Sequence, residues 1–99
     1  MISDQTRHIG VLLFSLFIPA AHSLKEKRMV LKSLKDKVRL KFNVSIAELD
    51  RDDKWQLATC GISMIGNDQR YIDSCLQHIL QYLESINGAE ISDHHIEFL

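Results

Sequence analysis

Hydrophobic residues follow two different periods along the chain, and the change from one to the other predicts where strands and helices lie. The segment from His8 to Ile18 is rich in Ile, Val, Leu and Phe and is closed by Pro19. Both of its alternating faces are apolar, which is typical of a strand that is covered on both sides. The pattern therefore predicts a first, central strand over residues 8–18.

Two later segments have the spacing of amphipathic helices. Ser23 is a natural N-cap, and Glu26 completes a capping box three residues on. The apolar stripe that follows consists of Leu24, Leu31, Leu34, Val38 and Phe42. A second helix is expected to begin after the pair at 67–68 and to end at Asn87-Gly88. Its expected core positions are Ile72, Cys75, Leu76, Ile79, Leu83 and Ile86.

Three shorter segments complete the pattern. Residues 44–49 and 57–65 read as two strands of a hairpin, joined by a polar turn at 50–55. Residues 90–99 read as a final, partly polar strand. The order of elements is therefore β-α-β-β-α-β.

This order predicts an α+β fold, a ferredoxin-like sandwich in which a four-stranded antiparallel sheet carries two helices on one face. We expect the first and third strands in the centre, a single domain over residues 1–99, and a flexible N-terminal extension at 1–7. The first strand is apolar on both faces, and Leu57 and Ile65 share one face of the third. The open sheet face therefore needs a cover, and a homodimer through that face is the simplest one.

Positive charge is concentrated in the first helix. The formal net charge is −1, yet residues 23–42 hold eight of the 12 Lys and Arg residues and only two of the 13 Asp and Glu residues. On a helical wheel, five bases form what we call the basic row: Lys25, Arg28, Lys32, Lys35 and Arg39. Three others, Lys27, Lys37 and Lys41, fall on the opposite flank of the apolar stripe.

Two interpretations of the basic row remain open. Like charges four residues apart destabilise a helix by about 0.2–0.5 kcal/mol per pair, so folding alone gives no reason for the row. The first interpretation is that the row is a phosphate-binding surface for RNA or the ribosome, with Lys27 as a supplementary contact. The alternative is a plain solvated face, because bases suit a helix C-terminus and long stems cover apolar surface. No base readout or DNA sequence readout is expected, because residues 56–65 contain no aromatic side chain.

Four short motifs follow one another in a fixed order. They are S-L-K-E-K-R at 23–28, F-N-V-S-I-A-E at 42–48, D-K-W-Q at 53–56 and G-N-D at 66–68. Together they resemble the YlxP-like family, a small bacterial domain of unknown function, over about residues 8 to 97.

The resemblance implies a ferredoxin-like fold and no established activity. Relatives often lie near genes for translation initiation and for ribosome-binding factor A, which favours ribosome or RNA biology. The residue before the first motif is often Arg in relatives and is His22 here. His22 is therefore a candidate for an additional anion contact that would act only when protonated.

The cysteines and the N-terminal segment indicate in which cellular compartment the protein is expected. Cys60 and Cys75 form no CxxC motif and read as buried structural thiols of a reducing compartment, although two cysteines can in principle pair. The apolar run after Arg7 resembles a signal peptide, but Asp4 opposes this and cleavage would remove the central strand. The run is also too short to span a bilayer. A cytoplasmic protein without membrane contact is expected.

Catalytic and metal chemistry has little support in the sequence. The topology is also similar to acylphosphatase, which needs a glycine-rich anion cradle where this chain has P-A-A-H-S-L. His94 and His95 should point to opposite sheet faces, and the acids at 50, 52 and 53 read as a polar turn, with a cation site as the alternative. We expect no catalytic residues, no metal site and no cofactor.

Trp55 leaves one more choice open. A tryptophan beside a loop reads as a cover over the core, with a binding platform as the alternative. The sequence as a whole thus favours a non-enzymatic accessory protein that binds RNA or the ribosome through its first helix. The alternative is a protein-interaction or dimerisation module that acts through the open sheet face and binds no nucleic acid.

Overall fold

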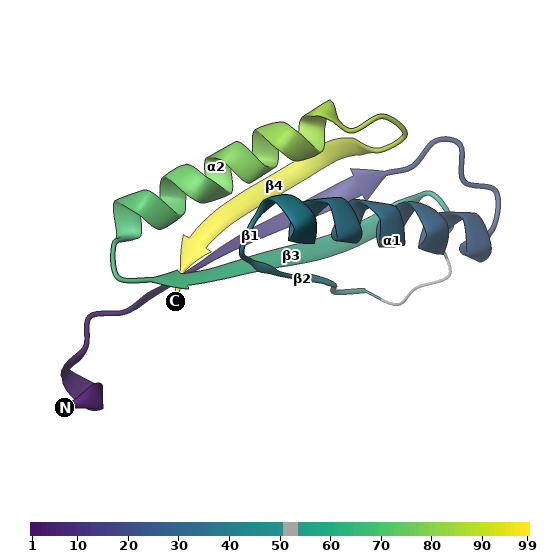
Figure 1. Cartoon of the computed structure of the whole chain (residues 1–99). Helices are drawn as coiled ribbons and strands as arrows, with labels where there is room; N and C mark the ends of the chain where they lie inside the picture. Colours follow the sequence, from purple (N-terminus) through teal and green to yellow (C-terminus); the bar gives the residue numbers. More distant parts are fainter. Residues whose placement is uncertain (51–53) are drawn as a thin grey trace.

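The computed structural model describes residues 1–50 and 54–99 and has the predicted order of elements (Figure 1). A short 3-10 helix, Ile2–Asp4, precedes the domain and is fully exposed. The strands and helices are β1 (His8–Phe17), α1 (Leu24–Lys41), β2 (Ser45–Glu48), β3 (Leu57–Gly66), α2 (Gln69–Ser85) and β4 (Glu90–Phe98). Within the described ranges, no helix is long and apolar enough to cross a membrane.

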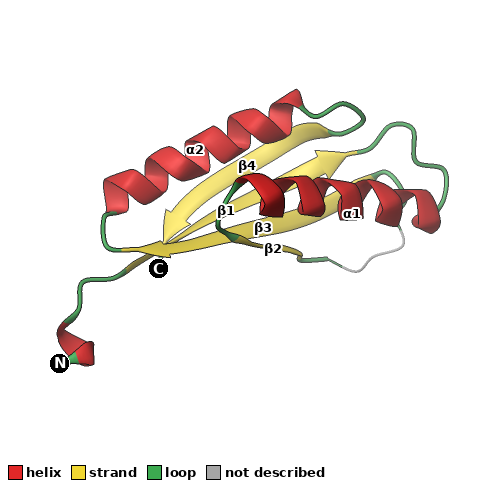
Figure 2. Cartoon of the chain, in the orientation of Figure 1, coloured by secondary structure: helices red, strands yellow, loops and turns green. Residues whose placement is uncertain are grey.

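The four strands form one antiparallel sheet in the order β2-β3-β1-β4, so β1 and β3 are central as predicted. Both helices lie on the same face of this sheet (Figure 2), which confirms the ferredoxin-like α+β fold. Leu13 of β1 pairs with Gly61 of β3 on one side and with His95 of β4 on the other. Within residues 1–50 and 54–99, the opposite face of the sheet carries no helix.

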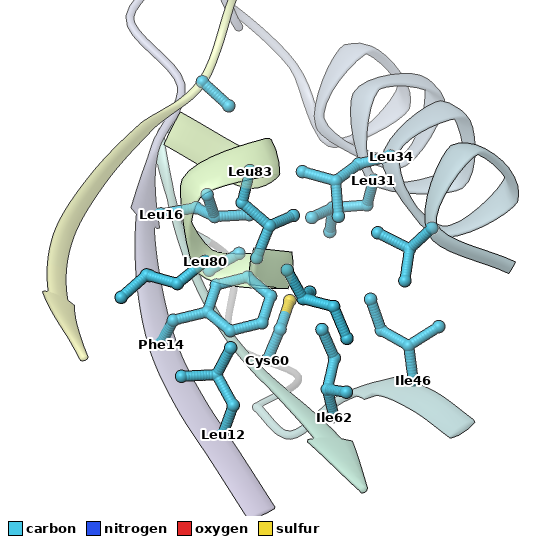
Figure 3. Packing of buried hydrophobic residues seen from close by; sticks show 14 of the residues in the cluster. Leu12, Phe14, Leu16, Leu31, Leu34, Ile46, Cys60, Ile62, Leu80 and Leu83 are labelled. Atoms are coloured by element: carbon cyan, nitrogen blue, oxygen red, sulfur yellow. The ribbon is translucent and has the colours of Figure 1, made fainter. Parts of the chain in front are cut away.

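The hydrophobic core fills the space between the sheet and the helices (Figure 3). Residues with even numbers in β1 point into it, and the sheet contributes Leu12, Phe14, Leu16, Ile46, Ala58, Cys60 and Ile62. The helices contribute Leu31, Leu34, Val38, Ile72, Leu76, Ile79, Leu80 and Leu83. Of the predicted helix positions, Leu24, Phe42, Cys75 and Ile86 are only half-buried, whereas Leu80 is buried and was not predicted.

The start of each helix is fixed by a side-chain cap. Ser23 accepts a hydrogen bond from the Glu26 N–H at 3.1 Å, as the capping box predicts. The Glu26 carboxylate, however, accepts from the N–H of His22 rather than from that of Ser23. In α2 the cap is Asp68, whose carboxylate accepts hydrogen bonds from the backbone N–H groups of Arg70 and Tyr71. These caps fix where α1 begins and therefore where its bases lie.

Candidate nucleic-acid interface

The two flanks of α1 face different neighbours. On one flank, the Arg39 guanidinium donates a hydrogen bond to the Ile46 carbonyl of β2 at 3.3 Å. On the other flank, the Lys41 ammonium lies 4.4 Å from the centre of the Tyr82 ring of α2. Because Arg39 belongs to the basic row, the row lies on the flank toward β2, at the outer edge of the sheet.

Arg39 also covers part of that edge. The Leu49 N–H bonds the Thr59 carbonyl at 2.7 Å, so residues with odd numbers in β2 direct their backbone groups toward β3. The Ile46 carbonyl therefore points away from the sheet, where another strand could otherwise bind it. The guanidinium of Arg39 occupies this acceptor.

The five bases of the basic row have different electrostatic surroundings. Lys32 lies 3.1 Å from the Asp36 carboxylate, and Arg39 lies 4.0 Å from it, so these two bases share one acid. In the part of the chain that the structure describes, no carboxylate pairs with Lys25, Arg28 or the half-buried Lys35. The exposed bases of the row that lack a carboxylate partner, Lys25 and Arg28, therefore lie in the first turns of α1.

The N-terminal end of α1 adds to the positive potential of these bases. The backbone N–H groups at a helix start carry a partial positive charge, and cations there are normally disfavoured. Lys25 and Arg28 are nevertheless both exposed in the first turns, and His22 is exposed directly before the N-cap. Three groups that can be cationic thus lie at the end of the helix that attracts anions.

Lys27 corrects the sequence-based prediction. Its side chain is buried, with 3% of the residue exposed, and its ammonium donates to the Lys54 carbonyl at 2.8 Å. The Glu48 carboxylate lies 4.0 Å away. An ammonium bound inside the protein is not available to a phosphate, so the prediction of Lys27 as a supplementary contact was wrong. The signal was present, because position 27 falls between Leu24 and Leu31 in the apolar stripe.

Trp55 differs from the prediction as well. Its side chain is 51% exposed, so it does not cover the core. The segment that carries it is held next to the loop before α1, since the Ile18 N–H donates to the Gln56 carbonyl at 2.8 Å and the Gln56 side chain donates to the Pro19 carbonyl at 2.9 Å. An exposed aromatic ring therefore belongs to the same end of the molecule as the least compensated bases.

The candidate metal ligands do not converge. His94 pairs with Phe14 and His95 with Leu13, so the two imidazoles belong to opposite faces of the sheet, as predicted. Within residues 1–50 and 54–99, no group of three or more His, Cys, Asp or Glu side chains could hold a metal ion. Of the predicted acidic turn, positions 52 and 53 lie outside the described residues, and Asp50 accepts a hydrogen bond from the Thr59 N–H.

The cysteines are free thiols in different surroundings. Cys60 is buried and Cys75 is half-buried. Burial, together with the smaller effect of the nearby charges of Glu48 and Asp50, raises the pKa of Cys60 to about 12. A thiol with this pKa is protonated at neutral pH and unreactive. Cys60 is therefore a core residue, not a nucleophile.

A second candidate surface is the sheet face without helices. A depression of about 220 Å³ lies there between β1, β2 and β3, and its lining is mostly apolar. It exists because Gly61 has no side chain, and a Cβ built there would lie 3.1 Å from Leu49 and 3.5 Å from Leu13. Further along β3, Ile65 is 67% exposed. This face can bind an apolar side chain.

Comparisons with known proteins agree with this fold and name no activity. A family described as "Protein of unknown function (DUF503)" matches residues 9–96. The "Uncharacterized protein YlxP" of Bacillus subtilis (strain 168) is 39% identical over 82 residues, which cover 83% of this chain and 89% of the relative. Among solved structures, the "De novo designed protein Foldit4" is similar with a TM-score of 0.54 and 12% identity, covering 93% of this chain and 96% of that one. The last similarity concerns the fold alone.

Proposed function

The chain belongs to the DUF503 family of proteins of unknown function, the family of YlxP, and we propose that it is a non-enzymatic accessory protein that binds structured RNA, on or off the ribosome, through the basic row of α1. The phosphate contacts are assigned to Lys25, Arg28, Lys32, Lys35 and Arg39. His22 adds a contact when its imidazole is protonated. Lys27 has no part in this surface.

One observation supports this proposal most strongly. Lys25 and Arg28 are exposed, have no carboxylate partner among the described residues, and lie at the end of the helix where the macrodipole disfavours cations. A helix that needed only solubility would be more stable with acids in these places. An anionic partner offsets both the lack of a carboxylate partner and the unfavourable interaction of these cations with the helix macrodipole, because it supplies negative charge.

The binding mechanism follows from the kind of groups available. Lys and Arg side chains neutralise phosphates and release the counterions condensed around RNA, which gives affinity without sequence specificity. The row runs along a helix of 18 residues, so its ends are about 21 Å apart at about 1.5 Å per residue. That length spans several phosphates. Exposed Trp55 offers a surface on which an unpaired base can stack.

The experiment is co-sedimentation with ribosomes and ribosomal subunits of the source cell over a salt series. The test variant carries Lys25→Glu and Arg28→Glu, which remove the least compensated bases and suit the helix N-terminus. The control carries Lys37→Glu and Arg70→Glu, which change the net charge equally at exposed positions outside the row. Circular dichroism checks that all three proteins are folded.

The proposal predicts salt-sensitive binding that the test variant loses and the control variant keeps. Equal loss in both variants would mean that only net charge matters. No binding of the wild type at low salt would contradict the proposal.

The second candidate function is protein interaction through the open sheet face. The apolar depression at Gly61 favours it. Salt distinguishes the two functions, because counterion release makes RNA binding fall steeply with salt whereas an apolar interface responds little.

A further inference from the structure

The open sheet face is divided into an apolar part and an acidic part. Strands β1 and β3 and the residue after β2 present the more apolar part, with Ile9, Val11, Leu13, Phe17, Leu49, Leu57 and Ile65 on this face. The hydroxyl side chains of Ser15, Thr59 and Ser63 lie among them. Strand β4 presents the acidic part. Its residues that pair with odd-numbered residues of β1 lie on the same, open face of the sheet. They are Glu90, Asp93, His95 and Glu97.

We propose that this face binds a second copy of the chain, related by a two-fold axis that runs parallel to the strands between β1 and β3. In this dimer, β1 of one copy stacks on β3 of the other, and β4 stacks on β2. The proposal is independent of RNA binding, because the basic row belongs to the helix on the other side of the sheet (Figure 1).

The size of the face fits a second copy. Strands β2, β3, β1 and β4 have 4, 10, 10 and 9 residues, so the sheet face covers about 520 Å² at about 3.3 Å per residue and about 4.8 Å per strand. Two such faces bury about 1,000 Å² together, which is about the smallest area of a specific interface. The apolar part of this face is self-complementary, since two sheets pack face to face at about 10 Å.

Charge selects the orientation of the axis. A two-fold axis perpendicular to the strands would place β4 on β4, so that Asp93 and Glu97 of the two copies would meet. Like charges facing each other in an interface are costly. An axis parallel to the strands instead places Glu97 and His95 of this strip over Ser45 and Ala47 of β2 in the other copy, and Asp93 beside Leu49. Only the second arrangement keeps the acids apart.

The same axis fixes the register of the interface. Rotation about an axis parallel to the strands does not change a residue's position along them. Leu13 and Gly61 are directly paired neighbours in the sheet, so Leu13 of each copy comes to lie over Gly61 of the other. There it meets the depression of about 220 Å³ between Leu13, Ala47 and Leu49. Each copy therefore supplies the side chain that fills the depression of the other.

The first test measures self-association by analytical ultracentrifugation over a range of concentrations at physiological salt. Leu13→Glu places a charge in the interface, and Gly61→Val fills the depression with a β-branched side chain that suits a strand. Each variant is expected to raise the dimer dissociation constant by at least about tenfold. The control Leu40→Glu changes an apolar side chain that is 89% exposed on α1 and is expected to have no effect.

The second test determines the axis by cross-linking in a Cys75→Ala background. Ala47 and His95 lie at the same height as Leu13 and Gly61, so a mixture of Ala47→Cys and His95→Cys proteins is expected to cross-link with a short bismaleimide. Cross-linking of His95→Cys to itself would indicate the perpendicular axis and overturn the proposal. A wild type that is monomeric at all concentrations, or a dimer unaffected by Leu13→Glu, would also overturn it.

Discussion

The ammonium of Lys27 lies 2.8 Å from the carbonyl oxygen of Lys54 and donates a hydrogen bond to it from inside the protein. This contact joins α1 to the chain between β2 and β3. Among the described residues, Glu48 of β2 is an acidic neighbour, 4.0 Å from the same ammonium. One lysine thus holds three segments of the chain together, although its neighbours in sequence belong to a basic surface.

We expect Lys27→Met to lower the free energy of unfolding by about 1–3 kcal/mol, because it leaves a carbonyl and a partly buried carboxylate without their donor. Urea unfolding followed by circular dichroism measures this. The control Lys37→Met removes an exposed charge from the same helix and is expected to stay within about 0.5 kcal/mol of the wild type. Equal stability of both variants would contradict the structural role of Lys27.

Within the basic row, we expect Arg28→Gln to weaken RNA binding more than Lys32→Gln does. The Lys32 ammonium is already paired with Asp36, so a phosphate must compete with that ion pair. Arg28 has no carboxylate partner among the described residues and binds a phosphate without this competition. Titration of a labelled structured RNA at several salt concentrations measures both affinities. For Arg28→Gln, the slope of log affinity against log salt should also fall by about 0.7–0.9 if one phosphate contact is lost. The reverse ranking would show that ion pairing within α1 does not govern the contacts.

Trp55 provides a spectroscopic test, because it is the only tryptophan of the chain. If an RNA base stacks on its exposed ring, bound RNA quenches its fluorescence, and Trp55→Leu lowers the affinity by about 1–3 kcal/mol. The matched control is Tyr71→Leu, which removes another exposed aromatic ring, on α2. Unchanged fluorescence at saturating RNA would exclude Trp55 from the interface.

Cys60 makes the free energy of unfolding depend on pH in the alkaline range. Its pKa is raised from 9.0 to about 12 in the folded protein, mainly by burial. Its contribution to stability is therefore complete below pH 9.0 and is lost as pH rises toward 12, by about 1.4 kcal/mol per pH unit, because the unfolded chain releases the thiol proton first. Urea unfolding between pH 8 and 11 should show this fall in the wild type and a smaller one in Cys60→Ala.

The fold could be predicted because its strongest determinants are local. The apolar run of β1, the cap at Ser23 and the turn after α2 at Gly88, which has a φ of 92°, each act over a few residues. Lys27 was mispredicted because residue type was given more weight than position in the stripe. Its aliphatic stem packs as the stripe requires, and the carbonyl that accepts from its ammonium lies 27 residues away.

The candidate site depended on relationships that a helical wheel does not contain. The wheel grouped the basic row correctly but could not show which flank faces β2, which the contacts of Arg39 and Lys41 decide. It also could not show that Trp55 is exposed, because that depends on how the segment before β3 packs against the loop after β1. Both are properties of tertiary packing.

The hydrogen bond from Arg39 to Ile46 has a consequence for how the protein behaves when it is concentrated. A bare edge strand can recruit strands from other molecules and grow into aggregates without limit. At one edge of this sheet an outward carbonyl is already taken, and at the other edge the pairing of β4 is interrupted by an irregularity between Ser15 and Leu16. Fibril-like growth through strand addition is therefore disfavoured at both edges. Arg39, which we propose as a phosphate contact, thus also hinders aggregation by covering one outward carbonyl of β2.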